Sequence, residues 1–398
     1  MTEVLCMIEP RLTSYSGHLY NYASSIKKIA DENKLLFKIL VSKECDSKIC
    51  NELNASKVFE INPSQKYFKN IFSKYFLATF IYNIHLYKGL KKIYNQSNER
   101  WILFMGTTQY IDLFAIFIFT LFAKHKPKIV LTLRMSIYRY DIKRWSIIVS
   151  LYKFGFLLLF LINKLTKNIF FITDSEMLKI EYEKLTFFKI NVLPIPHTLN
   201  NNFPTKKINE LTKTINIVSL GPARTQKGFT FICDLVIKYV TENPNPKANF
   251  ILQCNNTNIE DIIENSIERI KKLNSPYVEL LRNELSENDY FLLLEKSDIV
   301  LLPYNSKFYH VQTSGIFTEA LSAGKIVIVS DNTWMSLQLN KFNSGLVFEE
   351  NNFDSFYHKF EDAINNFDSL IKESQKNSTI WNEYHNSKNF VQSLLNLN

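Results

Sequence analysis

The sequence predicts an α/β protein built from two doubly wound parallel sheets, and three observations lead to this class. The chain has 398 residues, more than one ordinary hydrophobic core accommodates, and 46% of them are hydrophobic. Apolar runs of strand length alternate with helical segments, for example residues 215–220 followed by 229–240. Strands separated by helices imply parallel sheets with right-handed connections, in which ligands bind at the carboxyl ends of the strands.

The same patterns place the individual elements. In the first half, apolar runs predict strands at residues 3–9, 35–41, 58–61, 101–105, 128–133, 168–173 and 191–195. In the second half, they predict strands at 215–220, 248–253, 277–281, 299–302 and 326–329. Helices are expected to start at 19, 174, 229, 259, 286, 314 and 352, and a final helix at 381–397. The first helix follows Gly17, and residues 106–108 form a turn after a strand.

Residues 297–332 contain the clearest candidate for a binding site. The buried strand at 299–302 ends in Pro303-Tyr304, and Ser314-Gly315 then opens a helix that Gly324 ends. A helix that starts between two parallel strands offers unpaired N–H groups and a positive dipole to an anion. Glu319 lies in the second turn, where its carboxylate can accept hydrogen bonds from vicinal hydroxyls of a sugar; the alternative is an ordinary solvated glutamate.

A second candidate is the loop 221–228, which joins a buried strand to an apolar helix. It carries Arg224 and Lys227 with two residues between them. The planar guanidinium and the mobile ammonium suit a diphosphate and can neutralise the charge that builds up on a leaving group. The alternative is a basic surface loop that ends at a glycine.

Together these stretches resemble the C-terminal domain of GT-B glycosyltransferases, in particular the retaining enzymes of family 4. The resemblance lies in GPARTQKG at 221–228, SDIVLLPY at 297–304 and SGIFTEALSAGK at 314–325. It implies that Arg224 and Lys227 contact the donor diphosphate as catalytic residues and that Glu319 holds the ribose. The family's first glutamate falls on Val311, so Gln312 or the backbone of 314–317 would hold the sugar hydroxyls instead. The donor-binding residues that the resemblance implies in this half are Gly221, Ser314, Gly315, Ile316, Phe317 and Glu319.

The resemblance also gives expectations for the rest of the chain. Gly17 would allow close approach of the donor phosphates, and His18 would donate to phosphate or acceptor or simply cap its helix. Arg134, His197 and Tyr304 are candidates for the acceptor site or cleft. For Arg134 the alternative is an ion-pair partner, and for His197 a structural role near the hinge.

GT-B proteins have two Rossmann-like domains that face a central cleft, and we expect the same organisation here. The predicted boundaries are 1–205 for an acceptor-binding domain and 206–377 for a domain that binds the nucleotide sugar. Residues 378–398 would form a terminal helix that crosses back to the first domain. A polar linker is expected at 198–214.

Charge separates the two halves. Residues 1–210 hold 30 Lys and Arg against 16 Asp and Glu, a net charge of +14, whereas residues 211–398 hold 17 against 22, a net charge of −5. No nucleic-acid motif accompanies the basic half, so we expect no nucleic-acid partner. Residues 67–92 and 145–164 are rich in aromatic and aliphatic residues with interleaved lysines, as interfacial helices are, and an anionic membrane surface is the expected partner.

The segment 145–164 leaves three alternatives open: a core helix, a contact with one membrane leaflet, or a membrane span. A span is disfavoured because Lys153 in its middle costs about 2.5–3.5 kcal/mol on insertion. Five scattered cysteines and the lack of a signal-peptide pattern predict a cytoplasmic protein, peripheral on the inner face of the cell membrane.

The predicted function is transfer of a sugar, with retention, from a nucleotide diphosphate sugar to a glycan or lipid-linked acceptor in the synthesis of cell-surface polysaccharide or lipopolysaccharide. The sequence has no Asp-x-Asp triplet, so neither a metal nor another cofactor is expected. Two alternatives remain: a GT-B epimerase acting on nucleotide sugars, and a catalytically silent GT-B subunit that scaffolds a partner enzyme, which Val311 in place of the glutamate would fit.

Overall fold

The computed structural model describes residues 3–15, 18–63, 72–94, 99–137, 142–197, 214–255 and 260–397, with the side chains of 18, 72–76 and 142–146 outside the description. The chain forms two compact units. Unit 1 comprises Met1–Thr198 and His385–Asn398, and unit 2 comprises Leu199–Tyr384. Gly17, most of the predicted linker and the side chain of His18 lie outside the described residues.

Unit 1 is built on a parallel sheet of seven strands in the order β3-β2-β1-β4-β5-β6-β7. The strands are β1 (Glu3–Ile8), β2 (Leu36–Ser42), β3 (Ala55–Phe59), β4 (Arg100–Met105), β5 (Lys128–Leu133), β6 (Ile169–Thr173) and β7 (Ile190–Val192). The chain adds strands in one direction from β1 to β3 and in the other direction from β4 to β7. The order therefore reverses between β1 and β4, which is where open α/β sheets bind ligands.

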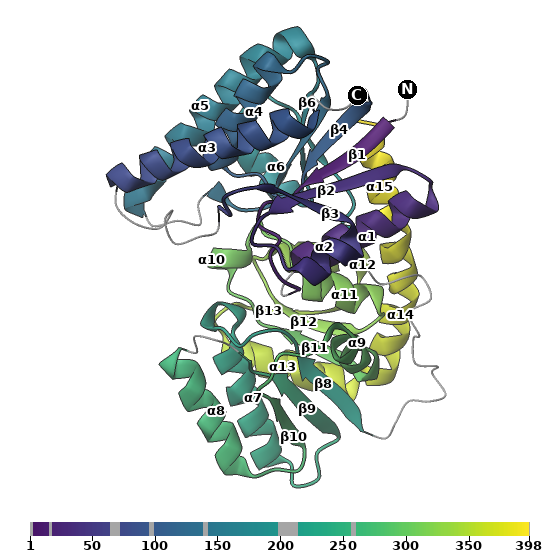
Figure 1. Cartoon of the computed structure of the whole chain (residues 1–398). Coiled ribbons are helices and arrows are strands. Elements are labelled where there is room, and N and C mark those ends of the chain that lie inside the picture. Colours follow the sequence, from purple (N-terminus) through teal and green to yellow (C-terminus); the bar gives the residue numbers. More distant parts are fainter. Residues whose placement is uncertain are drawn as a thin grey trace. The chain divides into compact units, whose positions relative to one another are not determined.

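The helices of unit 1 lie in two layers. They are α1 (His18–Glu32), α2 (Ser47–Leu53), α3 (Phe72–Tyr94), α4 (Tyr110–Phe122), α5 (Ile142–Thr166), α6 (Glu176–Glu183) and α15 (Ser387–Leu395). Right-handed connections place α1 and α2 on one face of the sheet and the helices that follow β3 on the other. Figure 1 shows α3, α4 and α5 side by side, and α3 and α5 each pack against α4.

The C-terminal helix α15 completes the core of unit 1. Phe390, Val391 and Leu394 are buried against α1 and the sheet, and the Phe390 ring lies 5.4 Å from Tyr22 and 5.7 Å from Phe104 between centroids. The predicted return of the chain end to the first domain is thus present, although it begins at His385 rather than at 378.

Unit 2 is built on a parallel sheet of six strands in the order β10-β9-β8-β11-β12-β13. The strands are β8 (Ile215–Ser219), β9 (Ala248–Gln253), β10 (Val278–Leu281), β11 (Ile299–Leu302), β12 (Ile326–Ser330) and β13 (Gly345–Phe348). The helices are α7 (Phe229–Glu242), α8 (Asp261–Leu273), α9 (Glu287–Lys296), α10 (Ser306–Tyr309), α11 (Gly315–Ser322), α12 (Trp334–Phe342), α13 (Phe353–Asn365) and α14 (Phe367–Tyr384). Strand order reverses between β8 and β11.

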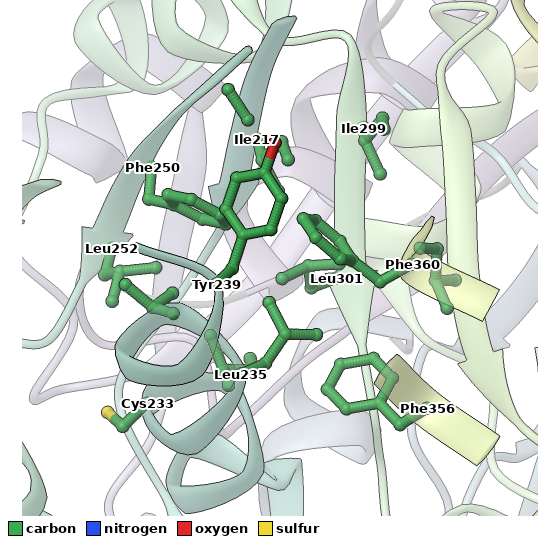
Figure 2. Packing of buried hydrophobic residues seen from close by; sticks show 14 of the residues in the cluster. Ile217, Cys233, Leu235, Tyr239, Phe250, Leu252, Ile299, Leu301, Phe356 and Phe360 are labelled. Atoms are coloured by element: carbon green, nitrogen blue, oxygen red, sulfur yellow. The ribbon is translucent and has the colours of Figure 1, made fainter. Parts of the chain in front are cut away.

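Aromatic side chains fill the space between the sheet of unit 2 and helices α7 and α13. Figure 2 shows Tyr239 of α7 between Phe250 of β9 and Phe360 of α13, and the Tyr239 centroid lies 5.0 Å from that of Phe360. Ile217 and Leu301 of the central strands face the same cluster and are almost fully buried. This core holds β8 and β11 side by side, so that the loops after these two strands lie at one edge of the sheet.

The two predicted domain boundaries need correction. The second boundary lies at 384/385 instead of 377/378, because α14 continues to Tyr384 and buries Trp381 in unit 2 against Phe317 and Phe342. The first boundary lies at 198/199 instead of 205/206.

The helix predicted at 145–164 is α5, the connection between β5 and β6. Residues 147–166 are long and apolar enough to cross a membrane by composition, yet Phe156 packs on Phe171 of the sheet with ring centroids 5.3 Å apart. One side of α5 therefore belongs to the core of unit 1, and only its other side is exposed.

Candidate functional site

The candidate site of unit 2 lies where the strand order reverses. The loop 221–228 follows β8, and residues 303–314 lead from β11 to α11. The two strands are neighbours in parallel register, with Ile217 opposite Ile299. Both connections consequently leave the same edge of the sheet, as the sequence predicted.

Close backbone contacts fix the shape of the loop 221–228. Gly228 has a φ of +66° and starts α7; a Cβ atom there would lie 2.0 Å from the carbonyl oxygen of Pro303. The N–H of Asn305 donates to the carbonyl of Gln226 at 3.0 Å, and the N–H of Gly221 donates to Oε1 of Gln253 at 2.6 Å. Only glycine fits at 228, because both the conformation and the approach to Pro303 exclude a side chain.

Lys227 turns its ammonium group back toward the start of the loop. A Cβ atom built on Gly221 would lie 2.8 Å from Nζ of Lys227 and 2.9 Å from Cδ1 of Ile316, so the ammonium lies beside the first turn of α11. Nζ also lies over the Tyr304 ring, 5.6 Å from its centroid. Burial and then the charge of Arg224 lower the pKa of Lys227 to about 8. An anion bound here would remove this electrostatic cost.

Arg224 is exposed at the outer end of the same loop. Its charge lowers the pKa of Glu260, although the larger cause is the pair of hydrogen bonds that Glu260 accepts from the hydroxyl and N–H of Thr225. Within the described ranges, neither Arg224 nor Lys227 forms an ion pair with a carboxylate at 4 Å or less. Among the described residues the loop thus presents two cations that have no carboxylate within ion-pair distance, which is unusual for a half-buried lysine.

The start of α11 supplies further donors. Ser314 is the N-cap, and its Oγ accepts from the N–H of Phe317 at 3.3 Å. As far as the described residues go, the N–H groups of Gly315 and Ile316 have no hydrogen-bond partner. A Cβ built on Gly315 meets no atom within 4 Å, so this turn faces open space. Two N–H groups without a described partner, at the positive end of a helix beside Lys227, are an arrangement that suits an anion.

Phe317 does not contribute its side chain to this site. The ring is fully buried, and its centroid lies 5.6 Å from Trp334 and 5.9 Å from Trp381. The prediction gave Phe317 a donor-binding role through its backbone, but its N–H donates to the Ser314 cap, and its ring faces the core.

Glu319 is half-buried and accepts a hydrogen bond from the hydroxyl of Tyr290 in α9. Burial raises the pKa of Glu319 to about 7, the Tyr290 hydrogen bond lowers it, and the charge of Glu287 raises it. The surface-glutamate alternative is therefore wrong for Glu319. The sequence analysis missed Tyr290, because its distance from Glu319 along the chain gives no local signal.

Two further predicted positions flank the site. Val311, the position at which the family resemblance expects the first glutamate, is buried and carries no charge. Tyr304 is also buried, with its ring 4.5 Å from that of Tyr309 and its hydroxyl beside Ser314.

In unit 1 the reversal of strand order holds a buried charged cluster. Arg11 donates from Nη1 to the carbonyl of Thr107 at 3.0 Å and from Nη2 to Asp112 at 3.1 Å. Tyr82 donates to the other oxygen of Asp112 at 2.7 Å. Beside them, Glu9 is fully buried, its Oε2 has no partner among the described residues, and burial raises its pKa to about 7. The sequence analysis identified the turn 106–108 but not this cluster.

The remaining predicted residues of unit 1 have structural partners. The guanidinium carbon of Arg134 lies 3.7 Å from the centroid of Tyr22, and its Nε lies 3.8 Å from Asp174. The ion-pair alternative for Arg134 is correct, but the pair is buried rather than at the surface. His197 is buried, its Nε2 lies 2.5 Å from the carbonyl oxygen of His385, and its own carbonyl accepts from Ser387. His197 thus anchors the C-terminal segment.

Metal ligands give no comparable cluster. Among residues that the structure describes, no group of three or more His, Cys, Asp or Glu side chains converges in a way that could hold a metal ion.

Comparison with solved structures shows that the fold is shared. The chain superposes over 99% of its length on 97% of a glycosyltransferase from Rickettsia africae ESF-5, with a TM-score of 0.73 and 13% sequence identity. It matches 99% of Anabaena Alr3699/HepE, solved in complex with UDP and glucose, over 99% of its own length with a TM-score of 0.67 and 11% identity. A protein from Listeria monocytogenes, described as a UDP-N-acetylglucosamine 2-epimerase, also matches. Its TM-score is 0.63 at 10% identity, and the match covers 98% of this chain and 94% of the Listeria protein. No protein-family model and no curated protein matches the sequence.

Proposed function

Because the chain has the GT-B fold of these proteins, we propose that it transfers a glycosyl group from a nucleoside diphosphate sugar to an acceptor hydroxyl. The observation that carries this proposal is the position of Lys227, with Arg224 nearby, beside the first turn of α11. Among the described residues the two cations have no carboxylate within 4 Å, and the N–H groups of Gly315 and Ile316 have no hydrogen-bond partner. A site with two cations, two N–H donors and no carboxylate partner fits a diphosphate. In this proposal Glu319, one turn further along α11, accepts hydrogen bonds from ribose hydroxyls.

The proposed reaction proceeds with retention of the anomeric configuration. The bond between the sugar's anomeric carbon and the diphosphate oxygen breaks, and a bond to the acceptor oxygen forms on the same face. The acceptor's proton passes to the departing diphosphate. Lys227 and Arg224 stabilise the charge that develops on this leaving group, so that the chemistry needs no metal ion.

The acceptor is proposed to be a glycan or a lipid-linked sugar of a cell-surface polymer, bound by unit 1. The cluster of Glu9, Arg11 and Asp112 lies where the strands of that unit reverse their order, and the turn 106–108 borders it. Its buried polar atoms support binding of a polyhydroxylated molecule at this edge of the sheet.

Binding of the donor is tested first. Purified protein is heated with UDP-, GDP-, ADP- and CMP-sugars, beginning with UDP-glucose because HepE was also solved with it. A ligand of the native state raises the apparent melting temperature. The Arg224→Ala and Lys227→Ala variants should each lower turnover about 10²-fold or more. Lys247, an exposed lysine of the same unit, provides the control Lys247→Ala. Wild-type turnover in both loop variants contradicts the proposal.

Two further measurements test the finer claims. The anomeric configuration of the product, determined by NMR, should equal that of the donor; inversion contradicts the retaining mechanism. Activity should survive a chelator, and loss of activity that Mg²⁺ or Mn²⁺ restores contradicts a metal-free reaction.

The Listeria protein makes an epimerase the second candidate. An epimerase would convert the nucleotide sugar without any acceptor, whereas a transferase releases free nucleoside diphosphate only when a sugar leaves it. Incubation with donor alone, followed by NMR of the sugar, separates the two. A silent scaffold subunit would bind nucleotide and show neither reaction.

A further inference from the structure

The outer side of helices α3, α4 and α5 in unit 1 exposes an unusual amount of apolar side chain. In each helix these residues follow a spacing of three and four, so they form one stripe per helix. Phe80 is 64% exposed, Phe122 67% and Leu165 83%. Because the three helices pack side by side, the stripes form one continuous surface, called here the α3–α5 face. Its ten large exposed hydrophobic residues are Leu77, Phe80, Ile81, Ile118, Leu121, Phe122, Phe154, Leu157, Leu161 and Leu165.

A row of lysines borders this face along one edge. The three helices run in the same direction, because each leads into the amino end of the next strand of a parallel sheet. Their C-terminal ends therefore lie at the same edge of unit 1. The exposed lysines at these ends are Lys88, Lys91 and Lys92 of α3, Lys124 and Lys126 after α4, and Lys164 and Lys167 at the end of α5.

Negative charge is almost absent from these helices. The sequences of α3, α4 and α5 contain a single acidic residue, Asp112. Its side chain is fully buried and bound to Arg11 and Tyr82. The α3–α5 face is consequently apolar in its middle and positive at its edge, with no carboxylate in its three helices to neutralise the lysines.

We propose that the α3–α5 face docks on the surface of an anionic lipid bilayer. The exposed aromatic and aliphatic side chains would enter the boundary between headgroups and acyl chains, and the lysine row would meet the lipid phosphates. Long lysine side chains allow this because their stems lie along apolar surface while the ammonium stays at the headgroups; Nζ of Lys164 lies 5.0 Å from the Phe160 centroid.

Other occupants fit the face less well. A second copy of the chain would offer the same surface, which has no carboxylates for the lysines. A membrane span by α5 would remove Phe156 and Tyr152 from the core they share with β6 and α6, where Tyr152 lies 5.8 Å from Tyr182 between centroids. Docking flat on one leaflet keeps that core intact. The proposal uses no residue of the nucleotide site and does not depend on glycosyl transfer.

The test is flotation of the purified protein with lipid vesicles. At low ionic strength the protein should bind vesicles of phosphatidylcholine with phosphatidylglycerol, and should bind phosphatidylcholine alone at least tenfold more weakly. The Lys91→Glu/Lys92→Glu variant should weaken binding about 25-fold or more, since each lysine near an anionic surface contributes about 1 kcal/mol, or fivefold. The Phe122→Ser/Leu161→Ser variant should weaken binding at least tenfold.

Matched controls lie elsewhere on the surface. Ile262 and Ile380 of unit 2 are 55% and 52% exposed, so Ile262→Ser/Ile380→Ser removes comparable apolar area. Lys48→Glu/Lys272→Glu reverses two exposed lysines on α2 and α8. Both controls should bind as the wild type does, and all variants should keep its melting temperature because the substituted side chains are exposed.

Three outcomes would overturn the proposal. The first is no binding to anionic vesicles at low ionic strength. The second is equal loss of binding in the control variants. The third is a dimer, seen by light scattering, that Phe122→Ser/Leu161→Ser dissociates, since the face would then be an interface between copies of this chain.

Discussion

Replacement of Lys227 by Met should make the free protein more stable and its binding of nucleoside diphosphate weaker. Methionine is an unbranched side chain only one atom shorter than lysine, and it carries no charge. In the folded chain the ammonium lies against Gly221 and Ile316 without an anionic partner among the described residues, and Arg224 adds a second positive charge nearby. The Lys227 ammonium therefore lowers the stability of the protein without ligand, and it is also the group that would bind a diphosphate.

The size of the effect follows from the pKa of Lys227. Burial and Arg224 lower it from 10.5 to about 8, which corresponds to at most about 3 kcal/mol at pH 7. The folded state binds fewer protons than the unfolded state between these two values, so the wild type gains stability as pH rises from about 8 to 10.5, and the cost is complete below pH 8. Because the side chain is only half-buried, we expect Lys227→Met to add about 1–3 kcal/mol at pH 7, or about 2–10 °C in melting temperature.

Calorimetry at pH 7 measures both effects. The melting temperature of Lys227→Met should exceed that of the wild type, and titration with UDP should show a dissociation constant about 10- to 100-fold higher, as expected for loss of one hydrogen bond to a charged group. Lys247→Met, at an exposed lysine of the same unit, should change neither value. A Lys227→Met protein of unchanged or lower stability that binds UDP as the wild type does would refute this account of the site.

Three further substitutions test other parts of the structure. Gly228→Ala should destabilise unit 2 by about 2–4 kcal/mol in denaturant titration, because the new Cβ meets the Pro303 carbonyl and φ is +66°. Gly315→Ala, where a Cβ meets no atom, should change stability by less than about 1 kcal/mol. Equal effects of the two substitutions would contradict this. UDP affinity should rise between pH 6 and pH 7 as Glu319, with a pKa of about 7, ionises while Lys227, with a pKa of about 8, stays charged. Glu319→Gln should lack this rise; the same pH profile in the variant removes the ribose role. Because the pKa of Glu9 is raised to about 7, the free energy of unfolding should fall by up to about 3 kcal/mol as pH rises from 4.5 to 7. Glu9→Gln should lack this fall in denaturant titrations at the two pH values. The same pH dependence in wild type and variant would show that Glu9 does not titrate in this range.

The elements of the sheets could be predicted because their signals are local. Apolar runs flanked by turns gave strands at 215–220, 299–302 and 326–329, and the structure has β8, β11 and β12 at these places. Ser286 followed by Asp289 predicted the start of α9, and the Ser286 Oγ accepts from the N–H of Asp289. Chain order alone does not give the strand order. The loop 221–228 and the start of α11 were both predicted at carboxyl ends of strands, and the GT-B resemblance joined them into one site; that β8 and β11 are neighbours is a finding of the structure.

Side-chain partners could not be predicted in the same way. The pairing of Tyr290 with Glu319 depends on how α9 packs beside α11, and the cluster of Glu9, Arg11 and Asp112 joins residues from three separate parts of the chain. Phe317 was assigned to the ligand because its neighbours carry the motif, whereas the helical period turns its ring inward. When a side chain is buried by residues that lie far away in the chain, no local pattern of residues in a single sequence indicates which side chains will meet.

The position of α15 sets the order in which the two units can fold on the ribosome. Phe390, Val391 and Leu394 lie in the core of unit 1 with Tyr22 and other residues of the N-terminal half. The ribosome synthesises these three side chains after all of unit 2, so unit 1 cannot close its core until residues 390–394 have been made. Unit 2, whose residues all precede His385, has its whole sequence available first. A chain truncated before residue 385 would therefore contain the whole of unit 2 and an incomplete unit 1, so the unit that comes first along the chain would be the later one to fold.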